Sequence, residues 1–267
     1  MSKKSVKNIE ALSPMEQEIY SKLYSKRIVR TDDVKEIVGG DHKSSDYISN
    51  LRKKGYFNKI HKGLYAIVPP NLIGQEDFSP DKILVASKVT GEYFISHHSA
   101  LEIHGLANTV HNKVWITVRK PHRSFSYKGI DYESVTTKYF FGFEKVDYLG
   151  TYVKVSDRER TLLDCLRKSG YAGGWEELIK SLNNLAHIDG AKLLKYLQRY
   201  DEKYLYQKTG FIIDMLDLNV NEELMVVLKD RMSERTYYLD KSKDSYYLSK
   251  WNLMVPKKFK RSCSVGN

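Results

Sequence analysis

The sequence predicts an α+β protein of two domains, and three observations lead to that prediction. Three short amphipathic helical segments and a basic hairpin occupy the first 70 residues, which end at Pro69-Pro70. Strand-like segments then dominate up to about residue 155, and helical segments fill most of the remainder. Runs of helices and strands that are segregated along a chain are typical of α+β domains. With 267 residues, the chain is long enough for each domain to bury its own core.

The first helix is predicted from a capping pattern, in which Ser13 caps the helix, Pro14 takes its first position and Glu16 lies three residues after the cap. Glycines or polar residues mark the ends of the helices and strands that are predicted next. We expect a helix over Thr31–Val38 that Thr31 caps and Gly39-Gly40 ends, a helix from about Ser44 to Lys54, and strands at Tyr56–Ile60 and Leu64–Val68 that are joined through Gly63. Three helices followed by a hairpin predict a winged helix-turn-helix domain over residues 1–70.

The second domain is assigned to residues 71–256, and residues 257–267 to a basic flexible tail. Its helices are expected at 81–89, 96–104, 157–167, 175–185, 191–200, 204–216 and 222–232, and its strands at 114–118, 127–132, 139–143 and 152–155. Ser156-Asp157-Arg158-Glu159 has the sequence of a capping box and opens the helix at 157.

The composition excludes several classes of protein. The longest apolar runs, such as Leu224–Leu228, are far shorter than the roughly 20 residues of a membrane span. The first ten residues contain no apolar signal-peptide segment, so a cytoplasmic protein without membrane contact is expected. Cys165 and Cys263 fit no metal or disulfide pattern, and Cys165 lies in an apolar helical pattern typical of a buried thiol.

The positive charge is concentrated in the first domain. The chain has a net charge of +11, and residues 1–70 hold 14 Lys and Arg against 8 Asp and Glu. An excess of this kind is typical of a domain that binds phosphates, although a merely basic protein would also show it. A winged helix that contacts another protein, with an ordinary solvated basic face, is the alternative.

Double-stranded DNA is the partner that these residues favour. In helix-turn-helix docking, the N-terminal part of the second helix reads base edges, while other cations contact phosphates. The candidates for base contacts are Lys43, Ser44, Ser45, Ser49, Asn50 and Lys53, and those for phosphate contacts are Arg52, Lys54, Lys59, His61 and Lys62.

No catalytic, cofactor or metal site is predicted, and we expect a protein that is not an enzyme. His98 and Glu102 share a helical face near His104, but no HExxH is present, so structural histidines are expected. Asp131 and Glu133 alternate on a strand and Asp147 and Lys154 follow, but their spacing matches no nuclease motif, and no phosphate-binding glycine motif occurs. The 20 tyrosines are as consistent with a packed sheet as with stacking on nucleotides.

Five segments in order resemble the AbiEi-type antitoxins, which are transcriptional regulators of type IV toxin–antitoxin systems of abortive phage infection. They are KGLYAIVP at 62–69, ISHHSALEIHGLA at 95–107, the segment 153–182, YQKTGFIIDML at 206–216 and SKWNLMVP at 249–256. The resemblance covers roughly residues 12 to 256. It departs at Lys208-Thr209-Gly210-Phe211, taken here as a turn, where many relatives have an Arg-Leu-Gly-Tyr-like sequence.

The resemblance implies a repressor of its own toxin–antitoxin operon. Its second domain would neutralise a nucleotidyltransferase toxin without a stable complex, and the family offers no catalytic residues to carry over. A homodimer or cooperative binding on DNA is also expected. Two alternatives remain open: a stand-alone regulator whose second domain senses a ligand or dimerises, and an enzyme that processes nucleic acids.

Overall fold

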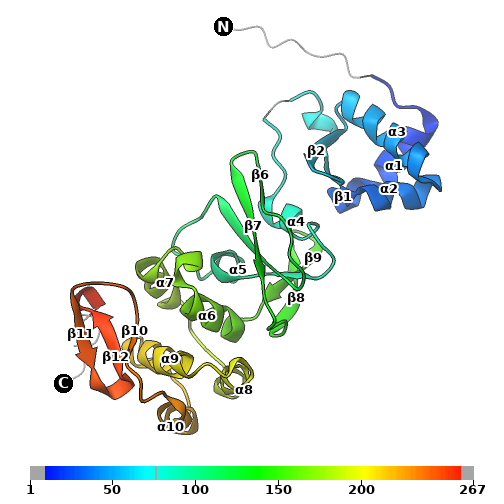
Figure 1. Ribbon diagram of the computed structural model, residues 1–267. Coiled ribbons are helices and arrows are strands. Elements are labelled where there is room, and N and C mark those ends of the chain that lie inside the picture. Colours follow the sequence, from blue (N-terminus) through cyan, green and yellow to red (C-terminus); the bar gives the residue numbers. More distant parts are fainter. Residues whose placement is uncertain (1–9, 76, 260–267) are drawn as a thin grey trace, which may run out of the picture.

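The structure, a computed structural model, describes residues 10–75 and 77–259 and has a mixed α and β architecture (Figure 1). A helical unit lies at one end, a six-stranded sheet in the middle, and helices with a small sheet at the other end. The α+β prediction agrees with this arrangement. No helix within the described ranges is both long enough and apolar enough to cross a membrane.

The N-terminal unit combines three helices with an antiparallel sheet in the order β1-β3-β2. Its elements are α1 (Pro14–Leu23), a 3-10 turn (Tyr24–Lys26), β1 (Ile28–Arg30), α2 (Thr31–Val38), α3 (Asp41–Lys53), β2 (Phe57–His61) and β3 (Leu64–Ile67), followed by a 3-10 turn at Pro70–Leu72.

The capping prediction for α1 is confirmed, since Ser13 N–H donates to Glu16 and Glu16 N–H donates to the Ser13 hydroxyl. The prediction for α2 is wrong by one residue, because Arg30 is the N-cap and its N–H donates to Asp33. Helix α3 begins at Asp41, three residues earlier than expected.

The sheet of the N-terminal unit is buried on both faces. Val29, Tyr65 and Ile67 pack with the three helices. The alternate side chains of the same strands belong to the core of the second domain, and these are Ile28, Ile60, Leu64 and Ala66. Since successive side chains of a strand point to opposite faces, β3 joins two cores at once.

The central sheet has the order β6-β7-β5-β4-β9-β8. Its strands are β4 (Tyr93–Ile95), β5 (Lys113–Val118), β6 (Phe125–Tyr127), β7 (Ile130–Thr136), β8 (Phe143–Tyr148) and β9 (Thr151–Ser156), and its helices are α4 (Lys82–Ala86) and α5 (His97–Ile103). The strands β5 and β7 pair in parallel, as do β4 and β9. The predicted strand at 139–143 is wrong, because the segment before Phe143 is irregular and Phe141 is buried among the helices.

Helices and a second small sheet form the C-terminal end. They are α6 (Arg158–Arg167), a 3-10 turn (Ser169–Ala172), α7 (Trp175–Leu182), α8 (Gly190–Tyr200), α9 (Lys203–Met215), α10 (Glu222–Arg231), β10 (Tyr237–Tyr238), β11 (Ser245–Leu248), a 3-10 turn (Ser249–Trp251) and β12 (Leu253–Pro256). The cap of α6 is Asp157, which accepts from the N–H of Arg160, and no Ser156–Glu159 capping box forms.

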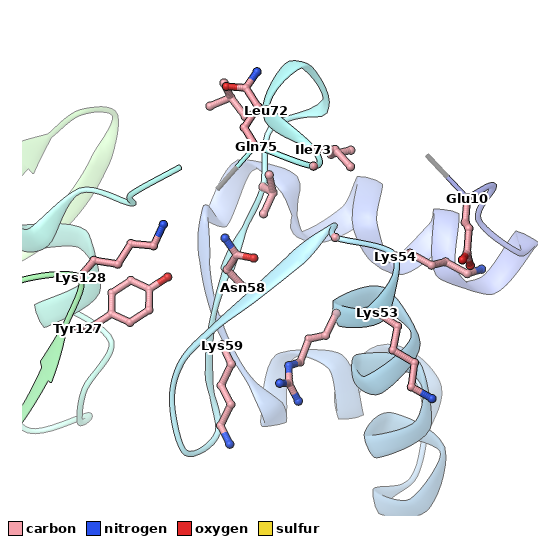
Figure 2. Close-up of a pocket in the computed structure, with 14 residues that line it drawn as sticks. Glu10, Lys53, Lys54, Asn58, Lys59, Leu72, Ile73, Gln75, Tyr127 and Lys128 are labelled. Atoms are coloured by element: carbon pink, nitrogen blue, oxygen red, sulfur yellow. The ribbon is translucent and has the colours of Figure 1, made fainter. Parts of the chain in front are cut away.

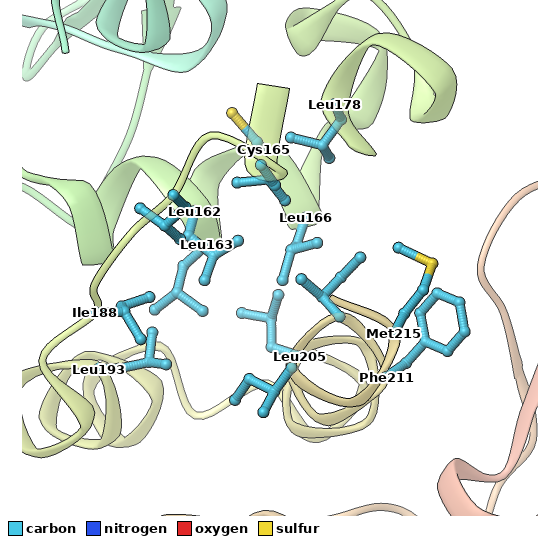
Figure 3. Close-up of a cluster of buried hydrophobic side chains, with 14 of the residues drawn as sticks. Leu162, Leu163, Cys165, Leu166, Leu178, Ile188, Leu193, Leu205, Phe211 and Met215 are labelled. Carbon is cyan, nitrogen blue, oxygen red and sulfur yellow. The ribbon is translucent and has the colours of Figure 1, made fainter. Parts of the chain in front are cut away.

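The largest core is centred on α6 and α9, where leucines of α6 lie near Leu205, Phe211 and Met215 of α9 (Figure 3). Cys165 is fully buried there, as predicted, and burial raises the pKa of its thiol. Phe259 is also buried in this core, so the predicted tail does not begin at 257. Cys263 lies outside the described residues.

Gly210 lies in the middle of α9, so the helix predicted at 204–216 is confirmed and the interpretation of 208–211 as a turn is wrong. The indole of Trp251 packs directly on it, and a Cβ at this position would lie 2.2 Å from the ring. The indole N–H donates to Asp214 one turn further along the helix, which holds the ring in place. The glycine therefore allows the C-terminal sheet to approach α9.

We expect Gly210→Ala to lower the free energy of unfolding by about 2 kcal/mol, because overpacking outweighs the better helix propensity of alanine. Chemical denaturation would measure the change. Gly170→Ala is the matched control, since a Cβ there meets nothing within 4 Å. Equal stability of the two variants would contradict the proposed close approach.

Lys208 is a cation in an apolar environment. Its ammonium lies 5.4 Å from the ring centroids of both Trp175 and Tyr204 and donates to the carbonyl of Leu166. Burial lowers the pKa of Lys208 to about 8, although Asp240 acts in the opposite direction. The folded protein therefore loses this proton at a lower pH than the unfolded chain.

We expect stability to rise with pH between about 8 and 10.5 on account of Lys208, because the unfolded chain binds the extra proton there. Measured against Lys208→Met, the wild type should gain about 2 kcal/mol from pH 7 to pH 9.5. Denaturant titrations of both proteins at the two pH values would measure it. A constant difference would show that the lysine is not desolvated.

Candidate nucleic-acid interface

Exposed cations gather where the end of α3 meets β2. Arg52 and Lys53 are exposed in the last turn of α3, and Lys59 is exposed on β2. Gly55 joins the two elements with a φ of 83°, a conformation that glycine adopts readily. This tight connection brings the helix end and the strand to one surface, on which Lys53 and Lys59 point to the same side (Figure 2).

These residues share a hollow of about 360 Å³. Its polar lining consists of Ser49, Arg52, Lys53, Asn58 and Lys59, and we call this surface the basic face. Three of the five residues are cations, and no carboxylate lines the hollow. A surface of this kind attracts polyanions and would raise their local concentration.

A larger cavity of about 730 Å³ continues from the basic face toward the second domain. Lys53, Asn58 and Lys59 line one side, and Tyr127 and Lys128 from the β6–β7 turn lie across from them (Figure 2). Lys128 is tied to this place by a hydrogen bond to the carbonyl of Phe78. The cavity is therefore shared by both domains.

The structure separates the predicted DNA-binding residues into three groups. Ser49, Arg52, Lys53 and Lys59 come together on the basic face. Lys43, Ser45, Asn50 and Lys62 are exposed but lie outside that hollow. Ser44, Lys54 and His61 have contacts within the protein that change the expected roles.

Ser44 and Lys54 are occupied by the fold. Ser44 is fully buried and its hydroxyl donates to the carbonyl of Asp41, so its side chain is not available to a base. The ammonium of Lys54 donates to Glu16 at 2.7 Å and to the carbonyl of Ala11 at 2.9 Å. Glu16 itself is buried, and Lys54 is its ion-pair partner.

His61 lies at the contact between the two domains. Its ring stacks on Phe125 at a centroid distance of 4.5 Å. Burial, followed by the nearby His122, Arg123 and Lys59, lowers the pKa of His61. The lowered pKa favours the neutral imidazole, and the stacked ring gives His61 a packing role in addition to the predicted phosphate contact, which stays a prediction.

Basic residues surround this contact, and the sequence analysis selected only Lys62 and His61 among them. A hollow of about 230 Å³ beside His61 is lined by Arg30, Lys62, Lys88 and His122, and no carboxylate lines it. Arg123 is close enough to affect the titration of His61. The run Arg119-Lys120-Pro121-His122-Arg123 is a visible basic signal, but nothing local in it indicates that it lies beside β2.

The histidine segment does not assemble a ligand set. His98 Nδ1 lies 3.1 Å from Glu102, and Nε2 lies 3.5 Å from Glu177. His104 donates instead to the carbonyl of Ser156 at 2.7 Å. Among residues 10–75 and 77–259, no cluster of three or more His, Cys, Asp or Glu could hold a metal ion.

Glu177 anchors this segment to α7. Burial raises the pKa of its carboxyl, but hydrogen bonds from Asn108 and Thr109 outweigh that effect and lower it to about 2. The carboxylate is thus ionised at neutral pH beside the fully buried ring of His98. This contact joins the central sheet region to the C-terminal helices.

The acidic residues weighed for a nuclease are separated. On β7, Asp131 accepts from Ser126, and Glu133 lies 3.7 Å from Lys113. Asp147 is on β8, and β5, β4 and β9 lie between the two strands. At roughly 4.8 Å per strand this places the carboxylates on the order of 19 Å apart.

Comparisons with known proteins concern the fold. No protein-family model matches the sequence, and no curated protein matches it. The structure is similar to the crystal structure of the RV2827C protein from Mycobacterium tuberculosis, with a TM-score of 0.67 and 15% sequence identity over 94% of this chain and 95% of that chain. The two proteins thus share an α+β fold over nearly their whole described length.

We expect Lys54→Met to destabilise the protein by about 2 kcal/mol, because it leaves the buried carboxylate of Glu16 without its charged partner. Lys53→Met is the matched control, since that side chain is exposed at the same helix end. Thermal or chemical denaturation would measure both. Equal stabilities of the two variants would show that the ion pair with Glu16 does not stabilise the protein and that Lys54 is available to a ligand.

Proposed function

We propose that this chain is a DNA-binding transcriptional repressor whose N-terminal unit is a winged helix-turn-helix domain. The observation that carries the proposal is the basic face with its exposed cations Arg52, Lys53 and Lys59 and no carboxylate in its lining. In a winged helix, α3 would enter the major groove and the β2–β3 hairpin would lie beside the backbone.

Two kinds of contact follow from this docking. The exposed Lys43, Ser45 and Asn50 of α3 would reach base edges, as amide and ammonium groups do in direct readout. The cations of the basic face and Lys62 would contact phosphates, which sets affinity and its dependence on salt. The basic loop of the second domain, with His122 and Arg123, would extend the phosphate contacts beyond the hairpin.

We further propose that the protein is an antitoxin of the AbiEi type. The sequence resemblance, which spans both domains, supports this half of the proposal. The operator would be the promoter of its own operon, and the second domain would counter a nucleotidyltransferase toxin without forming a stable complex.

A regulator whose second domain senses a ligand is the second candidate. The observation that favours it is a polar cavity in that domain, lined by His97, Arg160 and Arg167. The two candidates share the DNA-binding domain and differ in what acts on the second domain.

Lys53→Ala and Lys62→Ala should each weaken binding to the operator by about 1 kcal/mol and reduce the slope of log K against log[salt] by about one. Fluorescence anisotropy with labelled promoter DNA at several salt concentrations would measure both effects. Lys229→Ala, an exposed lysine on α10, is the matched control. Wild-type binding by both variants would place the DNA on another surface.

Repression is tested with the DNA upstream of the gene against scrambled DNA of equal length. A preference of about 10³-fold or more is expected for a specific repressor. Equal binding to both DNAs would contradict specific repression. For the antitoxin half, co-expression with a nucleotidyltransferase encoded beside the gene should restore growth, and continued growth arrest would contradict it.

A further inference from the structure

A cavity of about 300 Å³ in the second domain lies where two of the segments singled out in the sequence come together. His97 belongs to the segment 95–107, and Arg160, Asp164 and Arg167 belong to the segment 153–182. Lys168, at the end of α6, also belongs to the second segment. The rest of the lining comes from β5, β7, the irregular stretch after β7 and the N-cap of α9, with Thr117, Val135, Thr136, Thr137, Lys138, Tyr139 and Glu202. The DNA-binding proposal uses none of these residues.

His97 is held in an unusual conformation at this cavity. Its φ is 51°, which is uncommon for a residue with a side chain, and strain of this kind is often found at functional sites. The ring is buried, and burial lowers the pKa of His97 to about 4. The imidazole is therefore neutral near pH 7.

A pair of hydroxyl groups lies at one nitrogen of the His97 ring. Thr117 donates to the hydroxyl of Ser96 at 2.7 Å, and that hydroxyl lies 2.9 Å from Nδ1 of His97. Nδ1 of His97 is thereby occupied by the Ser96 hydroxyl. No hydrogen bond occupies Nε2 among the described residues, and His97 lines the cavity.

The cations of the cavity divide into paired and unpaired groups. Arg160 donates to Asp164 at 2.9 Å and to the carbonyl of Phe141 at 2.7 Å. Arg167 makes two hydrogen bonds of 2.8 Å with Glu202. These arginines have their charges balanced and form rigid walls.

Lys138 and Lys168 are exposed at the rim, and neither ammonium has a carboxylate partner within the described part of the chain. Four cations and two carboxylates line the cavity, which leaves a net charge of +2. A phosphate monoester carries about −1.5 to −2 at pH 7 and therefore matches this charge more closely than a single carboxylate does.

We propose that this cavity binds a small ligand through a phosphate group, which accepts a hydrogen bond from Nε2 of His97 and pairs with Lys138 and Lys168. Its volume lies at the low end for small-molecule sites, so the ligand is a phosphate monoester of about sugar size rather than a large cofactor. The inference rests on the second candidate function, ligand sensing by the second domain, and does not depend on DNA binding or on antitoxin activity.

The test is a titration of the isotope-labelled full chain with ribose 5-phosphate, followed by NMR and calorimetry. Ribose and sodium chloride at matched ionic strength are the ligand controls. Saturable shifts of the amides of residues 136–138 and 168 are expected with ribose 5-phosphate and not with the controls. Lys138→Gln/Lys168→Gln should bind at least tenfold more weakly, and both substitutions are at exposed positions that leave the core intact.

Two further variants separate the ligand contacts from general charge effects. His97→Asn should also weaken binding, and asparagine tolerates a positive φ better than most residues. Lys145→Gln removes an exposed lysine elsewhere on the domain and should bind as the wild type does. Absence of saturable shifts, or equal affinity in the double variant, would overturn the proposal. Loss of binding in Lys62→Gln but not in the double variant would place phosphate on the DNA-binding surface and would also overturn it.

Discussion

The arrangement of the molecule depends on one strand that is buried on both faces. Leu64 and Ala66 of β3 point into the core of the second domain, while Tyr65 and Ile67 point into the core of the three helices. Burial of each apolar side chain removes surface from water and favours contact by roughly 25 cal/mol per Å². The hairpin therefore cannot move independently of the second domain without exposing apolar surface. We call this contact between the β2–β3 hairpin and the second domain the seam. It places His61 against Phe125, and Lys62 near Lys88 and His122.

The seam also allows like charges to lie close together. The hollow beside His61 contains Arg30, Lys62 and Lys88 without a carboxylate in its lining, and their mutual repulsion must be offset by other contacts. The apolar contacts of the seam contribute that offset, and the neutral imidazole of His61 adds no further charge. A polyanion that binds this surface relieves the repulsion and stabilises the folded protein by mass action. The folded protein would therefore become more stable to unfolding when such a ligand is bound.

Capping and glycine patterns predicted those helix ends that are determined by residues close by in the sequence. The capping of α1 and the ending of α2 at Gly39 follow from a few side chains and a glycine with positive φ. The strands β1, β4 and β10 were missed, because each is two or three residues long and pairs with strands distant in sequence. The three cations of the basic face, Arg52, Lys53 and Lys59, were predictable because they lie close together in the sequence, at the end of α3 and on the strand that follows it. Burial of Ser44 and the ion pair of Lys54 depend on tertiary packing, which a sequence pattern does not contain.

A short segment connects the seam with the cavity of the second domain. Ile95 packs in the same core as Ile28 and Leu64, Ser96 accepts the hydrogen bond of Thr117, and His97 lines the cavity. Three consecutive residues therefore link the side of the protein that holds the N-terminal unit to the side that would hold a ligand. Removal of the second domain would expose the apolar face of β3 and also remove this link. The proposed DNA binding and the proposed ligand binding therefore each have to be measured on the whole chain.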